Sequence, residues 1–382
     1  MGNTVKRTHA VGAAVLAGLT ALALAACGSD NNSTGGGSTP TGGATTAAGP
    51  TTPAVQVSGT LNGGGSSAQA NAQKAWVAGF QTANTGATVN YSSTDSGSGR
   101  TGFIQGSLDF AGTDAALTTD ELSKAQARCN AGAAIDLPVY ISPIAVAFNI
   151  TGVTSLNLKP DTVAKIFAGK ITTWNDPAIT ADNPGVSALT GPITVAHRSD
   201  DSGTSKNFQD YLSKTAPDVW TYKVGNTWPV QVGQGGNGTQ GVVQIIQGAQ
   251  GTIGYIDASA LGSLGAAKLG VGTAFVGPTA DAAAKAVDAS PLDSTRGPND
   301  IVVNIDRTTT AAGAYPAVLV SYLAVCNTYD TQAKADLIKA YAGYVASSAG
   351  QSAAASAAGS APISPELQSK VSTALTAITA KA

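Results

Sequence analysis

The stretch ITVAHRSDDSGTSKNFQDYLSK, residues 193–214, places three patterns next to one another. It begins with a β-type run at residues 193–197 and ends with a run at residues 205–214 that follows the helical period. The turn between the two runs holds glycine and hydroxyl side chains. A strand that leads through such a turn directly into a helix is the repeating unit of α/β proteins. The stretch therefore predicts an α/β fold.

The same kind of turn occurs in two other places. GGGSSA at residues 63–68 and DSGSG at residues 95–99 have the same mixture of residues as DSGTS at residues 201–205. Glycine lets the backbone approach a ligand closely, hydroxyl groups donate hydrogen bonds, and the free N–H groups of a first helical turn carry partial positive charge. One such turn is usually only a helix cap, but three of them indicate a site for an anion.

Two charged residues make this hypothesis more specific. Arg198 follows the predicted strand, and its guanidinium offers a planar fork of donors that suits a tetrahedral oxyanion, with Asp200 near enough to hold it. Asp114 follows the strand-like residues 109–113 and would repel an anion unless the ligand carries a proton. The alternatives are a surface salt bridge for Arg198 and a turn or cap role for Asp114.

Strands and helices alternate along the rest of the chain. Further strands are predicted at residues 89–91, 109–113, 139–150, 251–257 and 317–325. Helices are predicted at residues 68–83, 119–127, 159–169, 241–247 and 331–348. The length of 382 residues suits about two domains, and no repeat of the solenoid type is present.

Residues 1–27 are typical of a lipoprotein signal peptide. Two basic residues precede an apolar stretch at residues 10–26 that is short for a membrane span, and LAAC at residues 24–27 resembles a lipobox. Lipidation of Cys27 would anchor the protein on the extracytoplasmic face of the cell membrane. The alternative is ordinary secretion with an incidental cysteine. Residues 28–57 are rich in Ser, Thr, Gly and Pro and are predicted to be a disordered linker.

The two remaining cysteines are Cys129 and Cys326. An even pair in an exported protein suggests a disulfide. Two buried, unpaired thiols remain the alternative, because a sequence does not say whether two Cα atoms lie within bridging distance.

Composition and motifs make several function classes improbable. With 23 acidic and 21 basic residues the formal net charge is −2, so nucleic-acid binding is not expected. The sequence has no Gly-x-Ser-x-Gly elbow and only two histidines, of which one is in the signal segment. The other, His197, could act as a base beside Ser202, but as the strand neighbour of Arg198 it should point to the opposite face. No ligand spacing suits a metal, and no cofactor is expected.

Seven segments resemble, in order and spacing, the phosphate-binding protein (PstS) family of Pst-type phosphate ABC importers. They are GSS at residues 65–67, DSGSG at 95–99, DFAGTD at 109–114, IFAGKITTW at 166–174, RSDDSGTS at 198–205, GY at 254–255 and YP at 315–316. The similarity extends through residues 58–382, and RSDDSGTS is its most specific part.

The resemblance implies a type II periplasmic-binding-protein fold, in which two α/β lobes with mostly parallel sheets are joined by two crossover strands. One lobe would combine residues 58–143 with residues 319–382, and residues 144–318 would form the other. The disulfide would then lie in the lobe that holds both chain ends. The ligand would be enclosed between the lobes, where closure removes water.

The resemblance also implies a ligand set and partners. The positions that match the family's phosphate ligands are Ser67, the backbone N–H of Ala68, Ser96, Asp114, Arg198, Ser202, Gly203 and Thr204. Asp200 would hold the Arg198 side chain in position and would not bind the ligand itself. The partners implied are inorganic phosphate and the permease subunits of an ABC importer, and the protein is expected to be a monomer.

Two departures from the family pattern stand out. Ala68 occupies a position where a bulky aromatic residue is common, which keeps the N–H but opens that wall of the cleft. The second turn carries Asp95 and Arg100, which either pair with one another or leave Asp95 facing the site, where it would weaken anion binding. Other functions considered are a secreted phosphatase, a phosphate-sensing surface protein, and an importer component for sulfate or molybdate.

Overall fold

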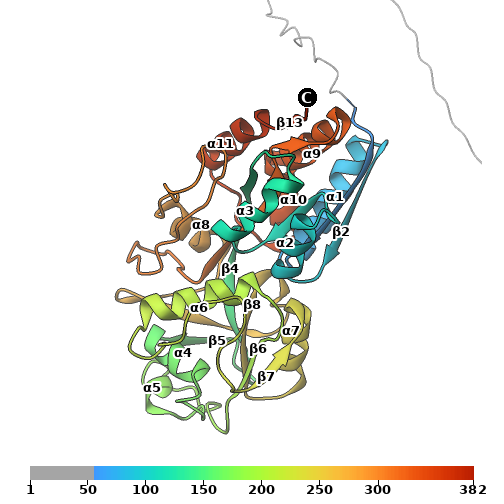
Figure 1. Ribbon diagram of the computed structural model, residues 1–382. Helices are drawn as coiled ribbons and strands as arrows, with labels where there is room; N and C mark the ends of the chain where they lie inside the picture. Colours follow the sequence, from blue (N-terminus) through green and yellow to red (C-terminus); the bar gives the residue numbers. More distant parts are fainter. Residues whose placement is uncertain (1–55) are drawn as a thin grey trace, which may run out of the picture. The chain divides into compact units, whose positions relative to one another are not determined.

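The computed structural model describes residues 56–382. The predicted signal peptide, Cys27 and residues 28–55 of the predicted linker lie outside the described residues. Strands and helices alternate through the described part, which confirms the predicted α/β class (Figure 1). None of the helices described there is long and apolar enough to cross a membrane.

The strands form one large mixed sheet and a separate pair of short parallel strands. The main sheet has the order β2-β1-β3-β11-β4-β8-β6-β7, and β9 pairs with β4, β5 and β10. Pairing is parallel around β1 at one end and around β6 at the other, and antiparallel where β3, β11, β4 and β8 meet. The strands are β1 (Gly59–Gly65), β2 (Ala87–Ser93), β3 (Phe110–Thr113), β4 (Ala134–Asn149), β5 (Ser155–Leu158), β6 (Thr194–Arg198), β7 (Gln234–Gly236), β8 (Thr252–Asp257), β9 (Gly265–Val271), β10 (Ala274–Val276), β11 (Val318–Cys326), β12 (Thr328–Tyr329) and β13 (Thr379–Ala380).

Helices lie around both parts of this sheet. In Figure 1, α1, α2, α3, α9, α10 and α11 lie around the part that contains β1, and α4, α5, α6 and α7 lie around the part that contains β6. The helices are α1 (Ala70–Ala83), α2 (Ser96–Ile104), α3 (Thr119–Arg128), α4 (Pro160–Phe167), α5 (Pro177–Thr180), α6 (Gly203–Thr215), α7 (Gly238–Gly248), α8 (Ala280–Asp288), α9 (Gln332–Ala346), α10 (Ser348–Ala358) and α11 (Pro365–Thr376), with a 3₁₀ turn at Ala258–Ala260.

The strand β4 belongs to both parts of the sheet. It is 16 residues long, and residues 134–143 pair with β11 whereas residues 144–149 pair with β8. Every residue of β4 except Asn149 is buried, because its almost continuous apolar run suits a strand that is covered on both faces. The chain leaves the β1 part through β4 and returns to it in β11, which begins at Val318.

The predicted disulfide between Cys129 and Cys326 is present. Their Cα atoms are 5.2 Å apart, and both residues are fully buried. Cys129 is the C-cap of α3 and Cys326 ends β11, so the bond joins two segments that are 197 residues apart in sequence.

Replacing Cys129 and Cys326 together by serine is expected to lower the free energy of unfolding by about 2–5 kcal/mol, since the bond restricts the unfolded chain over a long loop. Denaturant titration of the soluble domain measures this. A reducing agent should lower the stability of wild type toward that of the variant and leave the variant unchanged. Equal stability of the two oxidised proteins would contradict the prediction.

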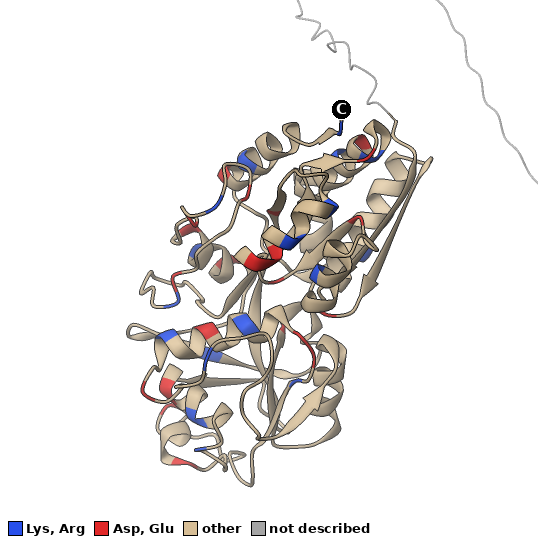
Figure 2. Ribbon diagram, in the orientation of Figure 1, with Lys and Arg blue, Asp and Glu red and all other residues tan. Residues whose placement is uncertain are grey.

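Charged residues are sparse in this protein. They make up 12% of the sequence, and Figure 2 shows both signs scattered along the ribbons between long uncharged stretches. An anion site in such a chain has to be built from local hydrogen-bond donors and a few well-placed charges, rather than from a basic surface.

Candidate functional site

The first glycine-serine turn lies between β1 and α1. Gly65 ends β1 with a φ of +130°, and a Cβ atom there would lie 2.2 Å from the carbonyl oxygen of Gly112 on β3. Only glycine suits this position, because it combines a left-handed backbone with a close approach to a neighbouring strand. The close approach places the buried Ser66 at the end of β3, where the Ser66 N–H donates to the Gly112 carbonyl at 2.8 Å.

The second turn is already part of a helix. Asp95 is the N-cap of α2, and its carboxylate accepts hydrogen bonds from the N–H and the hydroxyl of Ser98, both at 2.7 Å. Asp95 therefore does not pair with Arg100, as the sequence left open, but begins the helix in the usual way of a capping carboxylate. Ser96 is the first residue of α2, and its Oγ accepts the N–H of Asp114 at 3.2 Å.

The third turn connects β6 to α6. Ser202 is the N-cap of α6, and its Oγ accepts the N–H of Ser205 at 3.1 Å. A Cβ atom at Gly203 would lie 2.8 Å from both the Asp114 Cβ and the Ser96 Oγ, so glycine lets the start of α6 approach the start of α2 closely. The N-termini of these two helices meet at Asp114, which concentrates partial positive charge around it.

Arg198, the last residue of β6, is held by Asp200 as predicted. Nε donates to Asp200 Oδ1 at 2.6 Å, and Nη2 donates to Asp200 Oδ2. Both side chains are buried, with 3% and 5% of their surfaces exposed, and Asp200 also accepts the N–H of Gly238 at 3.2 Å. Nη1 has no hydrogen-bond partner among residues 56–382. The pairing fixes the guanidinium and leaves one of its edges for a ligand.

Tyr255 on β8 supports the same turn. Its hydroxyl accepts the Arg198 N–H at 3.1 Å and shares a hydrogen bond with the Ser205 hydroxyl at 2.7 Å. Burial raises the pKa of Tyr255 to about 12, so its hydroxyl keeps its proton. The tyrosine therefore links the end of β6 to the first turn of α6 and holds the loop between them.

Asp114 is enclosed by hydroxyl groups. Its Oδ1 accepts from Ser66 Oγ at 2.5 Å and from Ser321 Oγ at 2.7 Å, and its Oδ2 accepts from Thr204 Oγ1 at 3.0 Å. The residue is 3% exposed. These donors lie in the β1–α1 turn, in α6 and on β11, so the contacts of Asp114 extend well beyond its own turn. Both oxygens of Asp114 therefore act as hydrogen-bond acceptors.

Ser67 and Ala68 contact other protein groups in this structure. Ser67 Oγ lies 3.0 Å from Thr239 Oγ1 and accepts the Thr239 N–H at 3.0 Å, whereas the Ala68 N–H donates to Ser66 Oγ at 3.1 Å. Thr239 was not predicted as a site residue. The signal for it was present, because GNGT at residues 236–239 is a fourth glycine-rich turn that opens a helix.

Arg100 connects α2 to the β6–α6 turn. Its Nη2 lies 3.3 Å from Asp201 Oδ1, its Nε donates to Glu121 at 2.8 Å, and the Gly97 N–H donates to the Asp201 carbonyl at 3.0 Å. Burial acts to raise the pKa of Glu121, but the charge and hydrogen bond of Arg100 outweigh it and keep that pKa below its ordinary value. Arg100 is thus a buried cation that bridges the two parts of the sheet.

His197 is not placed to activate Ser202. Its imidazole stacks on Trp228 with ring centroids 5.6 Å apart, and its Nδ1 lies 2.9 Å from the Arg198 carbonyl oxygen. No hydrogen bond joins it to Ser202 in the described part of the chain. Within residues 56–382, no group of His, Cys, Asp and Glu side chains is arranged to hold a metal ion.

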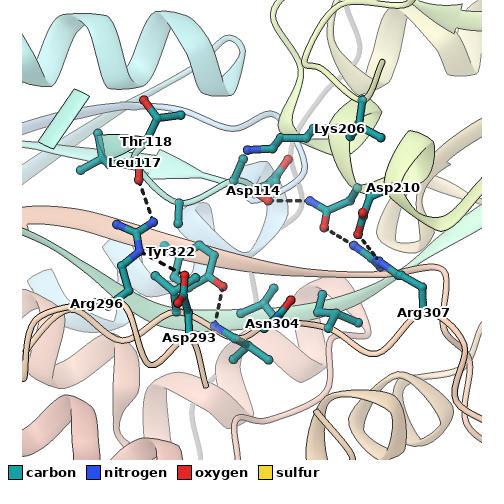
Figure 3. Close-up of a pocket in the computed structure, with 18 residues that line it drawn as sticks. Asp114, Leu117, Thr118, Lys206, Asp210, Asp293, Arg296, Asn304, Arg307 and Tyr322 are labelled. Carbon is teal, nitrogen blue, oxygen red and sulfur yellow. Dashed lines mark hydrogen bonds and ion pairs between the residues drawn. The ribbon is translucent and has the colours of Figure 1, made fainter. Parts of the chain in front are cut away.

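A cavity of about 300 Å³ adjoins Asp114 and Leu117 on one side and the segment before β11 on the other (Figure 3). Arg307 lies in its wall, and all three of its guanidinium nitrogens donate hydrogen bonds to protein groups. The acceptors are Asp210, Asn207 and the backbone carbonyls of Pro316 and Val318. Arg296 lies on the opposite wall and donates to the Leu117 carbonyl at 2.7 Å. The sequence did not predict these residues.

Comparison with known proteins gives concordant matches. A family model described as the PBP superfamily domain matches residues 44–349. The phosphate-binding protein PstS3 of Mycobacterium bovis (strain BCG / Pasteur 1173P2) is 36% identical over 366 residues, which cover 94% of this chain and 95% of that protein. PstS 3 of Mycobacterium leprae is 35% identical over 96% of this chain and 98% of its own length.

Solved structures resemble the fold. A high-affinity periplasmic phosphate-binding protein, PfluDING, bound with phosphate, has a TM-score of 0.67 and 21% sequence identity to this chain. The match covers 82% of this chain and 93% of that one. At this level of identity the likeness concerns the fold, which agrees with the predicted periplasmic-binding-protein class.

Proposed function

This chain belongs to the PstS family of phosphate-binding proteins within the PBP superfamily, and from that premise we propose that it captures inorganic phosphate outside the cytoplasm and delivers it to the permease of an ABC importer. It is a substrate-binding protein, not an enzyme. The position of His197 away from Ser202 agrees with this class.

The observation that supports phosphate most directly is the junction at Asp114. There the N-termini of α2 and α6 meet around a buried carboxylate that accepts three hydroxyl donors. Helix N-termini attract an anion, and the carboxylate tolerates one only if it brings a proton. Phosphate at neutral pH is an anion that still carries a proton.

The proposed ligand groups are those predicted from the sequence. They are Ser67, the Ala68 N–H, Ser96, Asp114, Arg198, Ser202, Gly203 and Thr204. In this proposal the Ala68 N–H leaves Ser66 Oγ for the ligand, and Arg198 binds through Nη1 while Asp200 holds its other nitrogens. The hydroxyl of Ser202 accepts the Ser205 N–H, so its own hydrogen is available to an oxyanion.

The molecule would bind phosphate by closure of two lobes. Residues 58–143 with residues 319–382 form one lobe, and residues 144–318 form the other. The change of partner within β4, from β11 up to residue 143 to β8 from residue 144, supports this boundary. The contacts between Asp114 and Thr204, and between Ser67 and Thr239, then belong to the closed state.

Arg100→Met is expected to weaken phosphate binding about 3- to 10-fold, because the contact of Arg100 with Asp201 joins the two lobes only when they are closed. The effect should be no larger, since an ion pair with one exposed partner contributes little free energy. Calorimetric titration measures the affinity. Asp201→Asn should give a similar loss, and the double variant should be no weaker than either single one. If the losses of affinity in the two single variants added up in the double variant, the proposed contact between the lobes would be contradicted.

The proposed localisation is the extracytoplasmic face of the cell membrane, with Cys27 as the lipid anchor and residues 28–57 as the tether. The disulfide between Cys129 and Cys326 agrees with an oxidising compartment. The protein is proposed to act as a monomer.

Cys27→Ser is expected to release the protein from membranes, because the lipid is attached through that thiol and the described residues hold no membrane-spanning helix. Fractionation of cells that express wild type or the variant tests this. The variant should move from the membrane pellet to the soluble fraction. A variant that still pellets with membranes would place the anchor elsewhere.

The decisive experiment is calorimetric titration of the soluble domain with phosphate, arsenate and sulfate. Phosphate should bind with a stoichiometry of one, arsenate should compete because it has the same shape and protonation, and sulfate should not. A chromogenic phosphate ester should remain unhydrolysed. A domain that binds no phosphate, or that turns the ester over, would refute the proposed function.

A further inference from the structure

We infer that Ser321 on β11, together with Gln69, which donates to it, holds Asp114 as a hydrogen-bond acceptor and so helps to select a protonated oxyanion. The inference rests on the proposed function and assigns part of the selectivity to residues outside the predicted ligand set. Ser321 and Gln69 are both completely buried, and both lie within the lobe that contains β1.

The contacts form a continuous chain. Tyr341 donates to Gln73 Oε1 at 2.6 Å, Gln73 Nε2 donates to Gln69 Oε1 at 2.7 Å, and Gln69 Nε2 donates to Ser321 Oγ at 2.6 Å. Ser321 Oγ then lies 2.7 Å from Asp114 Oδ1. A buried chain of this kind has to be fully satisfied, because each unpaired member would cost the desolvation of a polar group.

The direction of the hydrogen bonds follows from one backbone group. Gln69 Nε2 also lies 3.0 Å from the carbonyl oxygen of Tyr322, which can only accept. The amide nitrogen of Gln69 must therefore face that carbonyl, since the opposite orientation would set two acceptors against each other. The same nitrogen faces Ser321, so the serine hydroxyl accepts from Gln69 and its own hydrogen is left to donate.

The Ser321 hydrogen has two acceptors within reach. Asp114 Oδ1 is at 2.7 Å and the Thr113 carbonyl oxygen is at 3.1 Å. The carboxylate is the nearer of the two and carries the charge, so it is the stronger acceptor. Ser66 acts in the same way, because its Oγ accepts the Gln69 N–H at 3.4 Å and its hydrogen is left for the same Oδ1.

The consequence lies at the other oxygen of Asp114. Two hydroxyl groups donate to Oδ1, so a proton on that oxygen would displace one of them. The displaced hydroxyl would have no equally strong acceptor to donate to. Oδ2 accepts only from Thr204 among the described residues and has room for one more donor. That donor has to come from the ligand, which excludes an oxyanion without a proton.

The test compares the ratio of sulfate to phosphate dissociation constants in wild type, Ser321→Ala and Ser321→Thr. Ser321→Ala removes one of the two donors on Oδ1 and holds Asp114 less firmly as an acceptor. The ratio should therefore fall by about 10-fold or more, as expected for the loss of one hydrogen bond to a charged group. Sulfate affinity should rise while phosphate affinity changes little. Ser321→Thr keeps the hydroxyl and should restore the wild-type ratio.

Ser142→Ala is the matched control, because Ser142 is an equally buried serine on the neighbouring strand β4 and, within residues 56–382, makes no hydrogen bond to Asp114. Its ratio should equal that of wild type. Equal weakening of both anions in Ser321→Ala would indicate a structural role and overturn the inference. If Ser321→Ala does not fold, Ser321→Cys, which keeps the shape but donates weakly, should give a reduced ratio, and an unchanged one overturns the inference.

The measurements distinguish a failure of the proposed function from a failure of the role of Ser321. Wild type that binds no phosphate refutes the proposed function, and the inference with it. Wild type that binds phosphate and rejects sulfate, with the same ratio in Ser321→Ala, refutes only the role of Ser321.

Discussion

Arg198→Ala is expected to weaken phosphate binding by about 30- to several-thousand-fold, which corresponds to about 2–5 kcal/mol. The guanidinium is buried, with 3% of its side chain exposed, and Asp200 holds two of its nitrogens. Its removal deprives the ligand of a charge-assisted donor and leaves the Asp200 carboxylate buried without its main partner. A buried, uncompensated charge is the costlier part of such a loss.

Calorimetric titration with phosphate measures the effect of Arg198→Ala. Arg198→Lys should give an intermediate loss, because one ammonium group cannot serve Asp200 at two positions and a ligand as well. Lys159→Ala removes the same charge from a lysine that is 61% exposed and pairs with Asp182, so it should leave the affinity unchanged. A loss of less than threefold in Arg198→Ala would refute the role assigned to the arginine.

The β6–α6 unit could be predicted from the sequence because its parts are neighbours in the chain. Strand, turn and helix all lie within residues 193–214, and the pairing of Arg198 with Asp200 spans two residues. Capping residues such as Ser202 act on the backbone three residues away. Interactions between residues this close in the chain can be recognised from the order of residue types in the sequence.

The sequence predicted residues 95–99 as a turn that opens a helix, whereas α2 already begins at Ser96. Glycine at positions 97, 99 and 102 lowers the helix propensity of this segment, which argues against a helix. The structure explains the outcome through tertiary contacts: Asp95 caps the helix, and a Cβ atom at Gly99 would lie 2.6 Å from the Gly65 Cα. The glycines are there for close packing against β1, and that requirement outweighs propensity.

The start of β4 was also missed. The sequence placed a strand at residues 139–150, whereas β4 begins at Ala134. Asp136 is unusual in a buried strand, and burial, with the nearby charge of Asp300, raises its pKa to about 8. Arg296 lies close to both carboxylates. Partners 160 or more residues away cannot be recognised in a local pattern.

The support of Asp114 was beyond sequence analysis for the same reason. The carboxylate itself was predicted from its place after a strand, but Ser66, Thr204 and Ser321 reach it from three separate segments. Ser321 lies in an apolar strand, VLVSYLAVC, where a serine looks like an ordinary core residue. The next residue, Tyr322, pairs with Thr113 on β3, and this pairing brings the Ser321 hydroxyl beside Asp114.

Asp114→Asn is expected to permit sulfate binding, which wild type should reject by roughly 10⁴–10⁵-fold relative to phosphate. In wild type a sulfate oxygen would face the lone pairs of an ionised carboxylate, which leaves a buried acceptor unpaired and two negative charges in contact. In the variant the amide oxygen can keep the hydrogen bonds from Ser66 and Ser321, and the amide nitrogen can donate where Oδ2 accepted. Phosphate should still bind, with a shift toward its less protonated form.

Competition of unlabelled sulfate against labelled phosphate, measured across pH for both proteins, tests Asp114→Asn. Asp161→Asn is the matched control, because it removes the same charge from a carboxylate that is 56% exposed and, in the described part of the chain, pairs only with Lys165. It should exclude sulfate as wild type does. If wild type binds sulfate as well as phosphate, or if Asp114→Asn still excludes sulfate, then Asp114 does not select the ligand. The hydroxyl groups around it would in that case serve only to satisfy a buried carboxylate, because selection requires the acceptor to be the group that the ligand meets.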